Sequence, residues 1–334
     1  MTGGRAVMTA FVTGATGFVG AHVARALVAA GRRVRCLVRP CSRATLLADL
    51  GVERIEGDVT DAASVRRAMA DCEEVFHCAA DYRLYARSPA DIYRTNVEGT
   101  RIVLAAAADL GVRRVVHTSS VATLAARADG TPVDEQAVGT LADMIGDYKR
   151  SKLLAEREVE AACARGLPAV IVSPSTPVGD GDIKPTPTGK IVVDFLAGRF
   201  PAYVDTGLNL IDVRDVAAGH LLAAERGRIG ERYILANSNV TLKQLLQLLA
   251  GIAGRSAPRL RLPHWVPLAI AHVEAPIASL LRRDPRVPLD GARMARKPMF
   301  FDGTKAVREL GLPQSPIEPA LRRAVDWFRA NDYI

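Results

Sequence analysis

Tyr148 and Lys152 are the residues of this chain whose types and spacing most directly suggest proton chemistry. They are four positions apart, so on a helix they are neighbours on one face. A phenol has a reference pKa of about 10, and a nearby ammonium group lowers it by roughly one to three units. We therefore expect Tyr148 to exchange a proton with a carbonyl or alcohol oxygen. We expect Lys152 to assist it and to hold the ribose of a cofactor, although a Tyr-Lys pair at this spacing also occurs by chance on solvated helices.

Two further polar positions are candidates to complete this site. The run Thr118-Ser119-Ser120 closes an apolar, strand-like segment. We expect Ser120 to hydrogen-bond the reacting oxygen and to stabilise charge on it; the alternative is a serine cluster that only caps the strand. Asn96 is expected to bond backbone or water inside a long helix and to support a proton relay.

Three glycines near the start of the chain have the spacing of a nucleotide-binding turn. Gly14, Gly17 and Gly20 follow an apolar strand and open a helical pattern. In this context the first glycine permits a tight turn, the second lets backbone approach a pyrophosphate, and the third lets the helix pack on the strand. The helix N-terminus adds unpaired N–H groups and a partial positive charge. The pattern therefore predicts a dinucleotide site, with an ordinary turn as the alternative.

The end of the second predicted strand indicates which nucleotide would bind. An acidic residue there would hydrogen-bond the ribose 2′-OH of NAD, but the chain has Arg39 and Arg43 and no carboxylate between residues 35 and 43. An arginine can bind a 2′-phosphate through two parallel hydrogen bonds. The sequence thus favours NADP(H), with NAD(H) as the alternative cofactor. The other interpretation is a solvated loop in an arginine-rich protein.

Other strand ends supply further cofactor candidates, because ligands of open parallel sheets lie at the carboxyl ends of the strands. Asp58 could accept from the adenine amino group, and the small residues Ala79 and Ala80 would leave room for ribose and diphosphate. The full set of predicted cofactor contacts is Gly14, Thr16, Gly17, Phe18, Val19, Gly20, Arg39, Arg43, Asp58, Val59, Ala79, Ala80, Thr118, Tyr148, Lys152, Pro174 and Ser175.

Alternating apolar runs and amphipathic stretches must position these residues, and they predict an α/β fold. We expect a doubly wound parallel sheet of the Rossmann type over residues 1–174, and a smaller substrate lobe over residues 175–334 with some segments returning to the core. Predicted strands are 6–13, 34–38, 52–56, 74–78, 113–118 and 169–173. Predicted helices are 17–30, 62–69, 90–110, 145–165, 213–225, 242–251 and 319–329. The Pro- and Gly-rich stretch 174–181, with Pro185 and Pro187 after it, is predicted to be a loop.

Length and composition limit the class of protein. With 334 residues, 49% of them hydrophobic, the chain can bury a large core. Its net charge of +8 comes mostly from dispersed arginine, and no nucleic-acid-binding motif accompanies it. Five scattered cysteines have no metal-type pairing, and we expect no metal. Two of these cysteines fall inside apolar, strand-like runs, so we expect a reducing cytoplasm, and the first residues do not have a signal-peptide pattern.

Residues 262–283 form an unusually apolar stretch. Between positions 262 and 281 there is a single formal charge, at Glu274, and arginines flank both ends. Prolines at 263, 267 and 276 argue against a continuous spanning helix. The stretch could form a buried lobe helix or a wall of the substrate pocket. The alternative is peripheral contact with the inner membrane.

These residues together resemble the extended short-chain dehydrogenase/reductase family, and Val38-Arg39-Pro40 is similar to its dihydroflavonol-reductase branch, whose members use NADPH. The matching motifs are Thr13-Gly14-x-x-Gly17-x-x-Gly20, Gly57-Asp58-Val59, Asn96-Val97-x-Gly99-Thr100, Ser119-Ser120, Tyr148-x-x-x-Lys152 and Asp212-Val213-x-Asp215-Val216. Longer strings more closely resemble a bacterial group called hopanoid-associated sugar epimerases. They are 79–84, 174–177, 182–189 and 201–209.

The resemblance implies an enzyme of hopanoid biosynthesis that acts on a small-molecule or lipid-linked sugar substrate. An epimerase usually retains NAD, whereas NADPH suits net reduction, so Arg39 favours a carbonyl reductase. The alternatives are an epimerase or dehydratase with retained nucleotide, and a noncatalytic NADP(H)-binding sensor. A homodimer is expected, as in many relatives. Predicted substrate contacts are Asp81, Tyr82, Tyr85, Thr123, Thr176 and Lys184.

Overall fold

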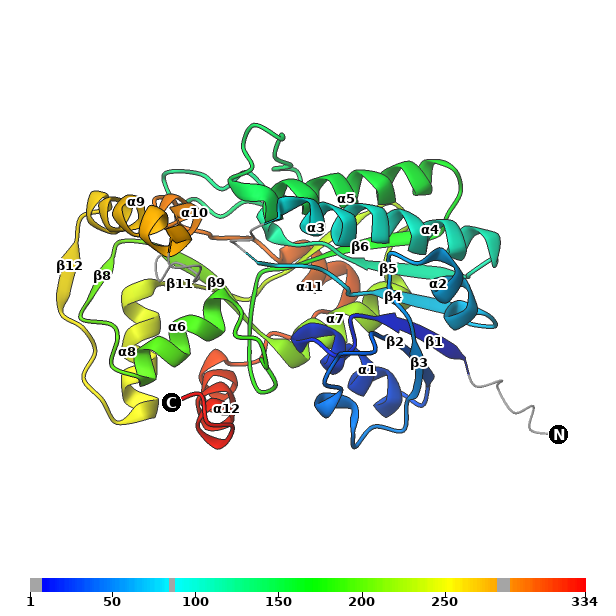
Figure 1. Cartoon of the computed structure of the whole chain (residues 1–334), viewed down its shortest axis with the longest axis horizontal. Helices are drawn as coiled ribbons and strands as arrows, with labels where there is room; N and C mark the ends of the chain where they lie inside the picture. The colour runs from blue at the N-terminus through cyan, green and yellow to red at the C-terminus, as the bar shows by residue number, and fades with distance from the viewer. Residues whose placement is uncertain (1–7, 84–87, 281–288) are drawn as a thin grey trace.

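A parallel sheet of seven strands forms the centre of the part of the protein that the computed structural model describes, namely residues 8–83, 88–280 and 289–334 (Figure 1). The strand order is β10-β6-β5-β4-β1-β2-β3. The chain order reverses between β1 and β4, where a doubly wound sheet opens its ligand crevice. The predicted fold class is therefore confirmed. The strands are β1 (Thr9–Thr13), β2 (Arg33–Val38), β3 (Glu53–Glu56), β4 (Glu74–His77), β5 (Arg114–Thr118), β6 (Ala169–Pro174) and β10 (Arg232–Leu235).

Helices cover both faces of this sheet (Figure 1). On one face lie α1 (Phe18–Ala29), α7 (Val213–Arg226) and α11 (Thr304–Leu310), whose apolar residues form one core with the strands. On the other face α2 (Ala62–Met69), α4 (Gly99–Asp109) and α5 (Gly146–Ala164) form a second core. The central strands β1 and β6 are buried along their whole length and are mainly apolar, as expected for strands covered on both faces, whereas the edge strand β3 is largely exposed.

The predicted elements of the first half agree with the structure to within a few residues, with one change of geometry. The helix expected over 90–110 consists of α3 (Pro89–Tyr93), a π-helical turn at Arg94–Glu98, and α4. Two short 3₁₀ turns, Thr45–Leu47 and Val121–Thr123, were not expected. The start of the strand predicted over 6–13 lies partly outside the described residues.

The second half contains a smaller lobe. A three-stranded sheet has the order β11-β9-β7, and β8 pairs with β12. Helices α6, α8 and α12 pack together around a separate apolar core. The bounds are β7 (Thr176–Val178), β8 (Ala202–Val204), β9 (Gly207–Asp212), β11 (Ser238–Thr241), β12 (Leu260–Leu262), α6 (Pro187–Leu196), α8 (Leu242–Ala253) and α12 (Ile317–Ala330).

The loop predicted from Pro174 onward is partly wrong. Thr176–Val178 pairs in parallel with β9, and Pro187 starts a helix. The Thr186 side chain caps that helix by accepting a hydrogen bond from the Gly189 N–H. Proline is favoured at the first helical position, where its missing N–H would have no partner in any case.

The apolar stretch forms α9 (Trp265–Leu280), followed by the short α10 (Leu289–Met294). Pro276 lies inside α9, so this proline does not end the helix. Residues 281–288, which include the end of the predicted membrane-contact stretch, lie outside the described residues. Within the described chain, no helix is both long enough and apolar enough to span a bilayer.

Candidate active site

The predicted catalytic residues meet at the carboxyl ends of β4 and β5, beside the first turns of α5. Tyr148 and Lys152 lie on α5, and Ser120 follows β5. Burial raises the pKa of the Tyr148 phenol, and a hydrogen bond with the Ser120 side chain opposes that effect. This direction is opposite to the lowering expected from Lys152, because desolvation of the phenolate dominates and the opposing effect comes from Ser120 rather than from the Lys152 charge. Tyr148 is therefore protonated at neutral pH and can act as a proton donor.

Lys152 is almost completely buried, with 3% of its surface exposed. Its Nζ donates a hydrogen bond to the Thr118 carbonyl oxygen at 2.5 Å. Burial lowers the pKa of the ammonium to about 8. The bond to Thr118 fixes α5 against the end of β5, which sets where Tyr148 lies relative to Ser120.

The two serines after β5 have different environments. Ser119 is buried, and its hydroxyl donates to Glu156 Oε2 at 2.6 Å. Ser120 is half-buried, and its Oγ accepts from the Ala122 N–H. Thr123 is fully buried, and its hydroxyl donates to the Ser120 carbonyl oxygen at 2.9 Å. Thr123 thus holds Ser120 in place in this structure, and its hydroxyl is not presented to a substrate.

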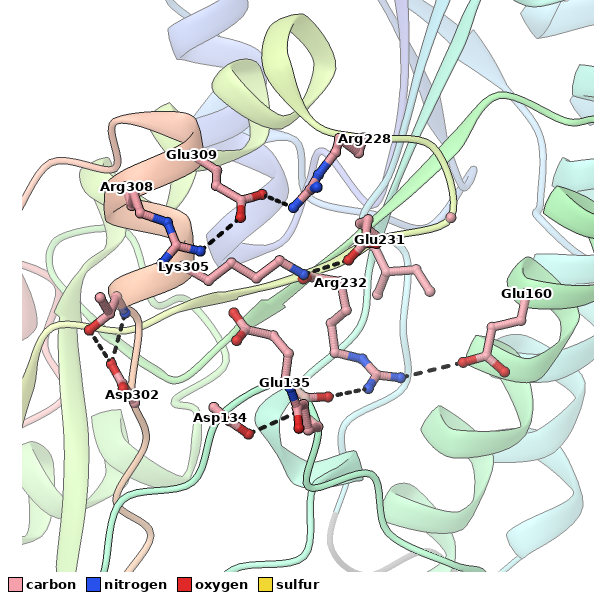
Figure 2. A pocket seen from close by; sticks show the side chains of 14 residues that line it. Asp134, Glu135, Glu160, Arg228, Glu231, Arg232, Asp302, Lys305, Arg308 and Glu309 are labelled. Atoms are coloured by element: carbon pink, nitrogen blue, oxygen red, sulfur yellow. Dashed lines mark hydrogen bonds and ion pairs between the residues drawn. The ribbon is translucent and has the colours of Figure 1, made fainter.

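Glu156 continues the catalytic face of α5 and was missed by the sequence reasoning. It is fully buried, four residues after Lys152, and forms an ion pair with Arg232 of β10. Figure 2 shows Arg232 reaching between Glu135 and Glu160 in a charged surface cavity. The Arg232 guanidinium donates to the Glu135 carbonyl oxygen. The edge strand, the catalytic helix and the serine loop are therefore linked by one polar network.

Asn96 lies in the π-helical turn and bonds backbone, as predicted. Its side-chain amide exchanges hydrogen bonds with the backbone N–H and C=O of Asp81, at 2.7 and 2.9 Å. It also donates to Ser151, whose hydroxyl donates to the Tyr148 carbonyl oxygen. Single π-turns are common at functional sites, and here the turn ties the loop after β4 to the catalytic helix.

Three buried histidines lie beneath the site and were not singled out from the sequence. His77 bonds Thr13 at 2.7 Å, and His220 bonds Thr118 at 2.9 Å. Burial, followed by the charge of Lys152, lowers the pKa of His77 to about 3 and that of His117 well below its usual value. Burial likewise lowers the pKa of His220 to about 4, so all three rings are neutral at neutral pH.

The glycine-rich turn has the geometry that a dinucleotide requires. Gly14 has a φ of +70°, and a Cβ there would lie 2.6 Å from the Ala79 nitrogen. A Cβ on Gly20 would collide with the Gly14 carbonyl oxygen. Gly17 precedes α1 without a side-chain cap, so the first N–H groups of that helix are open to an anion. The Ser175 hydroxyl at the end of β6 is buried with no hydrogen-bond partner in the described chain. These features fit the predicted nicotinamide dinucleotide.

The remaining cofactor candidates lie at neighbouring strand ends. Arg39 and Arg43 are exposed after β2. Asp58 Oδ1 accepts from both the backbone and the hydroxyl of Thr60, at 2.9 and 2.8 Å. Ala79 donates its N–H to the Thr13 hydroxyl at 3.2 Å. The other candidates around this crevice, by element, are Thr16, Phe18 and Val19 at the start of α1, Val59 after β3, Ala80 after β4, Thr118 on β5, and Pro174 on β6.

The structure brings two predicted substrate residues together. The Tyr82 hydroxyl donates to the Lys184 carbonyl oxygen at 2.7 Å, which joins the loop after β4 to the Pro-rich segment. Asp81 forms a two-pronged ion pair with Arg83. Burial tends to raise the pKa of Asp81, but Arg83 and the charge of Arg39 lower it. The Arg39 charge therefore acts on the site. Thr176 is half-buried on β7 and Tyr85 lies outside the described residues.

The family model and the most similar proteins agree on the family of this chain. The model of the NAD dependent epimerase/dehydratase family matches residues 10–236. A protein of Synechocystis, provisionally named dihydroflavonol 4-reductase, is 48% identical and covers 97% of this chain and 95% of its own. "Sterol demethylase protein B" of Methylococcus capsulatus is 36% identical, and the match covers 98% of this chain and 100% of that protein. The crystal structure of gox2253 superposes with a TM-score of 0.87 at 44% sequence identity, and the match covers 98% of this chain and 99% of that one.

Proposed function

The chain belongs to the NAD dependent epimerase/dehydratase family of extended short-chain dehydrogenases and reductases, and on that premise we propose that it is an NADPH-dependent carbonyl reductase. Its substrate is a carbonyl group on a sugar-like or hopanoid side chain. Members of this family act on small molecules with a nicotinamide nucleotide. The choice of NADPH, of reduction and of a hopanoid substrate is our proposal.

Arg39 is the observation that carries the choice of nucleotide. It is exposed directly after β2, where the 2′ position of the adenosine ribose would lie, and its charge reaches Asp81. A guanidinium there would bind a 2′-phosphate, whereas an acidic residue would repel it. Cells keep the NADP pool largely reduced, so an enzyme that selects NADPH is suited to net reduction.

The proton chemistry of the site is consistent with reduction. When bound, NADPH supplies a hydride from nicotinamide C4 to the carbonyl carbon. The protein must then protonate the oxygen. Tyr148, whose pKa is raised by burial, carries the required proton on its phenol oxygen. Ser120 contacts Tyr148 and can hydrogen-bond the same oxygen.

The substrate class rests on the sequence strings that resemble the hopanoid-associated group and on one relative. "Sterol demethylase protein B" is named for a polycyclic isoprenoid and covers nearly the whole chain. Hopanoids are polycyclic lipids with a polar side chain, and the site offers polar groups at Asp81 and at the contact between Tyr82 and Lys184. A cytoplasmic enzyme of hopanoid side-chain synthesis would account for the similarity to a protein named for a sterol and for the polar groups at the site.

The nucleotide preference can be tested with a matched pair of variants. Arg39→Ala should weaken NADPH binding by about 10- to 100-fold, because it removes a charge-assisted contact, and should leave NADH binding unchanged. Arg33→Ala is the control, since Arg33 is exposed at the opposite end of the same strand. Fluorescence titration of both variants gives the affinities. An equal loss for NADPH and NADH, or no loss, would argue against a 2′-phosphate contact.

A further inference from the structure

Helix α9 exposes a broad apolar face. Trp265 is 68% exposed, Val273 66%, Ile270 49% and Ile277 45%. We call these four residues the α9 face. Ile270, Val273 and Ile277 are spaced by three and four positions, so they lie along one side of the helix. Single exposed apolar residues are ordinary, but a continuous apolar strip on a soluble surface indicates an interaction site.

Basic side chains border this face. From Arg255 to Lys297 the described residues include six lysines and arginines and two acidic residues. Arg259 and Arg261 are exposed where β12 leads into α9, and Arg261 forms an exposed ion pair with Asp205 at 3.5 Å. Arg296 and Lys297 are exposed after α10, which packs on α9. An apolar helix face with a tryptophan and flanking basic residues has the chemistry that binds the interface of an anionic bilayer.

The α9 face is close to the catalytic helix through α10. The Asp290 carboxylate lies 2.5 Å from the position that a Cβ on Gly146 would occupy, and Gly146 begins α5 two residues before Tyr148. Figure 1 shows α9 and α10 beside one another on the side of the molecule toward which the N-terminal end of α5 points. A surface that holds α9 would therefore also lie near the N-terminal end of the catalytic helix.

We propose that the α9 face docks on an anionic lipid bilayer and brings the active site to substrate held in the membrane. The inference rests on the proposed function, because a hopanoid substrate would reside in the bilayer. Trp265 would lie among the headgroups and the three aliphatic side chains would enter the acyl boundary. The substrate could then reach Tyr148 without its apolar ring system crossing water.

A second copy of the chain is a weaker occupant for this face. A 16-residue helix is about 24 Å long. A strip of that length, about 10 Å wide, is well below the roughly 800 Å² that each partner buries in a stable interface. The positive charges that border the face would also repel one another in a symmetric pair, whereas anionic lipid would attract them.

Vesicle co-sedimentation tests the proposal independently of catalysis. Wild-type protein should bind to phosphatidylcholine vesicles that contain phosphatidylglycerol, and it should bind much more weakly to vesicles of phosphatidylcholine alone. The double variant Val273→Asp/Ile277→Asp should bind these anionic vesicles at least about tenfold more weakly. Ile229→Asp is the control, since Ile229 is 58% exposed and lies in the turn before β10, outside the α9 face. Tryptophan emission, which comes from exposed Trp265 and half-buried Trp327, should shift to the blue on binding in the wild-type protein and in the control.

Turnover of a water-soluble aldehyde, followed by NADPH oxidation, should be the same in the double variant and the wild-type protein. This assay keeps a failure of docking distinct from a failure of the proposed reductase. Absence of vesicle binding by the wild-type protein, or equal binding by the double variant, would overturn the proposal. So would lipid-independent self-association that the two aspartates abolish.

Discussion

Lys152→Met should make the protein more stable at neutral pH while it removes activity. The folded protein holds the Lys152 pKa at about 8, against the usual lysine value of 10.5. A difference of about 2.5 units corresponds to about 3 kcal/mol of unfavourable free energy for the buried ammonium at pH 7. Loss of the hydrogen bond to Thr118 offsets roughly 1 kcal/mol of the gain. We therefore expect the free energy of unfolding to rise by about 1 to 2 kcal/mol.

The pH dependence of this gain distinguishes it from a simple packing effect. Between pH 8 and 10.5 the unfolded chain still holds the Lys152 proton that the folded chain has released. The wild-type protein therefore becomes more stable as the pH rises through this window, and the variant does not. The advantage of the variant should shrink by roughly 2 kcal/mol between pH 7 and pH 10.

Urea unfolding of both proteins at pH 7 and pH 10 measures the effect. Lys243→Met serves as the control, because Lys243 is exposed on α8 and should show no difference between the two pH values. A stability difference for Lys152→Met that is the same at both pH values would refute the reasoning. It would mean that burial does not hold the ammonium at an unfavourable pKa.

Three other substitutions test the site. Tyr148→Phe should leave NADPH affinity nearly intact and reduce kcat by about 10²- to 10⁴-fold; full activity would remove the proposed proton donor. Glu156→Gln removes the closest acidic partner of buried Arg232, so it should cost about 3 kcal/mol in urea unfolding and lower kcat without changing the Kd for NADPH; unchanged kcat would leave Glu156 a purely structural role. Gly20→Ala places a Cβ against the Gly14 carbonyl oxygen, so NADPH titration should show an affinity loss of at least about tenfold; unchanged affinity would mean that the turn adapts.

Local sequence signals were sufficient for the parts of the site that lie on one element. The spacing of Tyr148 and Lys152 predicts a shared helix face, and the glycine pattern predicts the turn before α1. Pro187 was assigned to a loop because a proline within a loop and a proline at the first position of a helix look alike in sequence. The structure distinguishes them, since Thr186 caps the helix that Pro187 begins. The direction of the Tyr148 pKa shift was also wrong, since burial cannot be read from spacing.

The network around Glu156 could not be predicted in this way. Arg232 is 76 residues further along the chain and reaches Glu156 only because β10 returns to the edge of the sheet beside β6. The hydrogen bond from Ser119 to Glu156 is also long-range, since it joins residues 37 positions apart, after β5 and on α5. One signal was available: Glu156 follows Lys152 by four residues, as Lys152 follows Tyr148, so it occupies the same helix face.

The most direct test of NADPH-dependent reduction is to identify by mass the nucleotide that copurifies with the protein, and then to titrate the emptied protein with NADPH and NADH. The account predicts exchangeable binding with a strong preference for NADPH. A stoichiometric, retained NAD⁺ would contradict the role of Arg39 and would identify the chemistry as epimerisation or dehydration with internal return of the hydride.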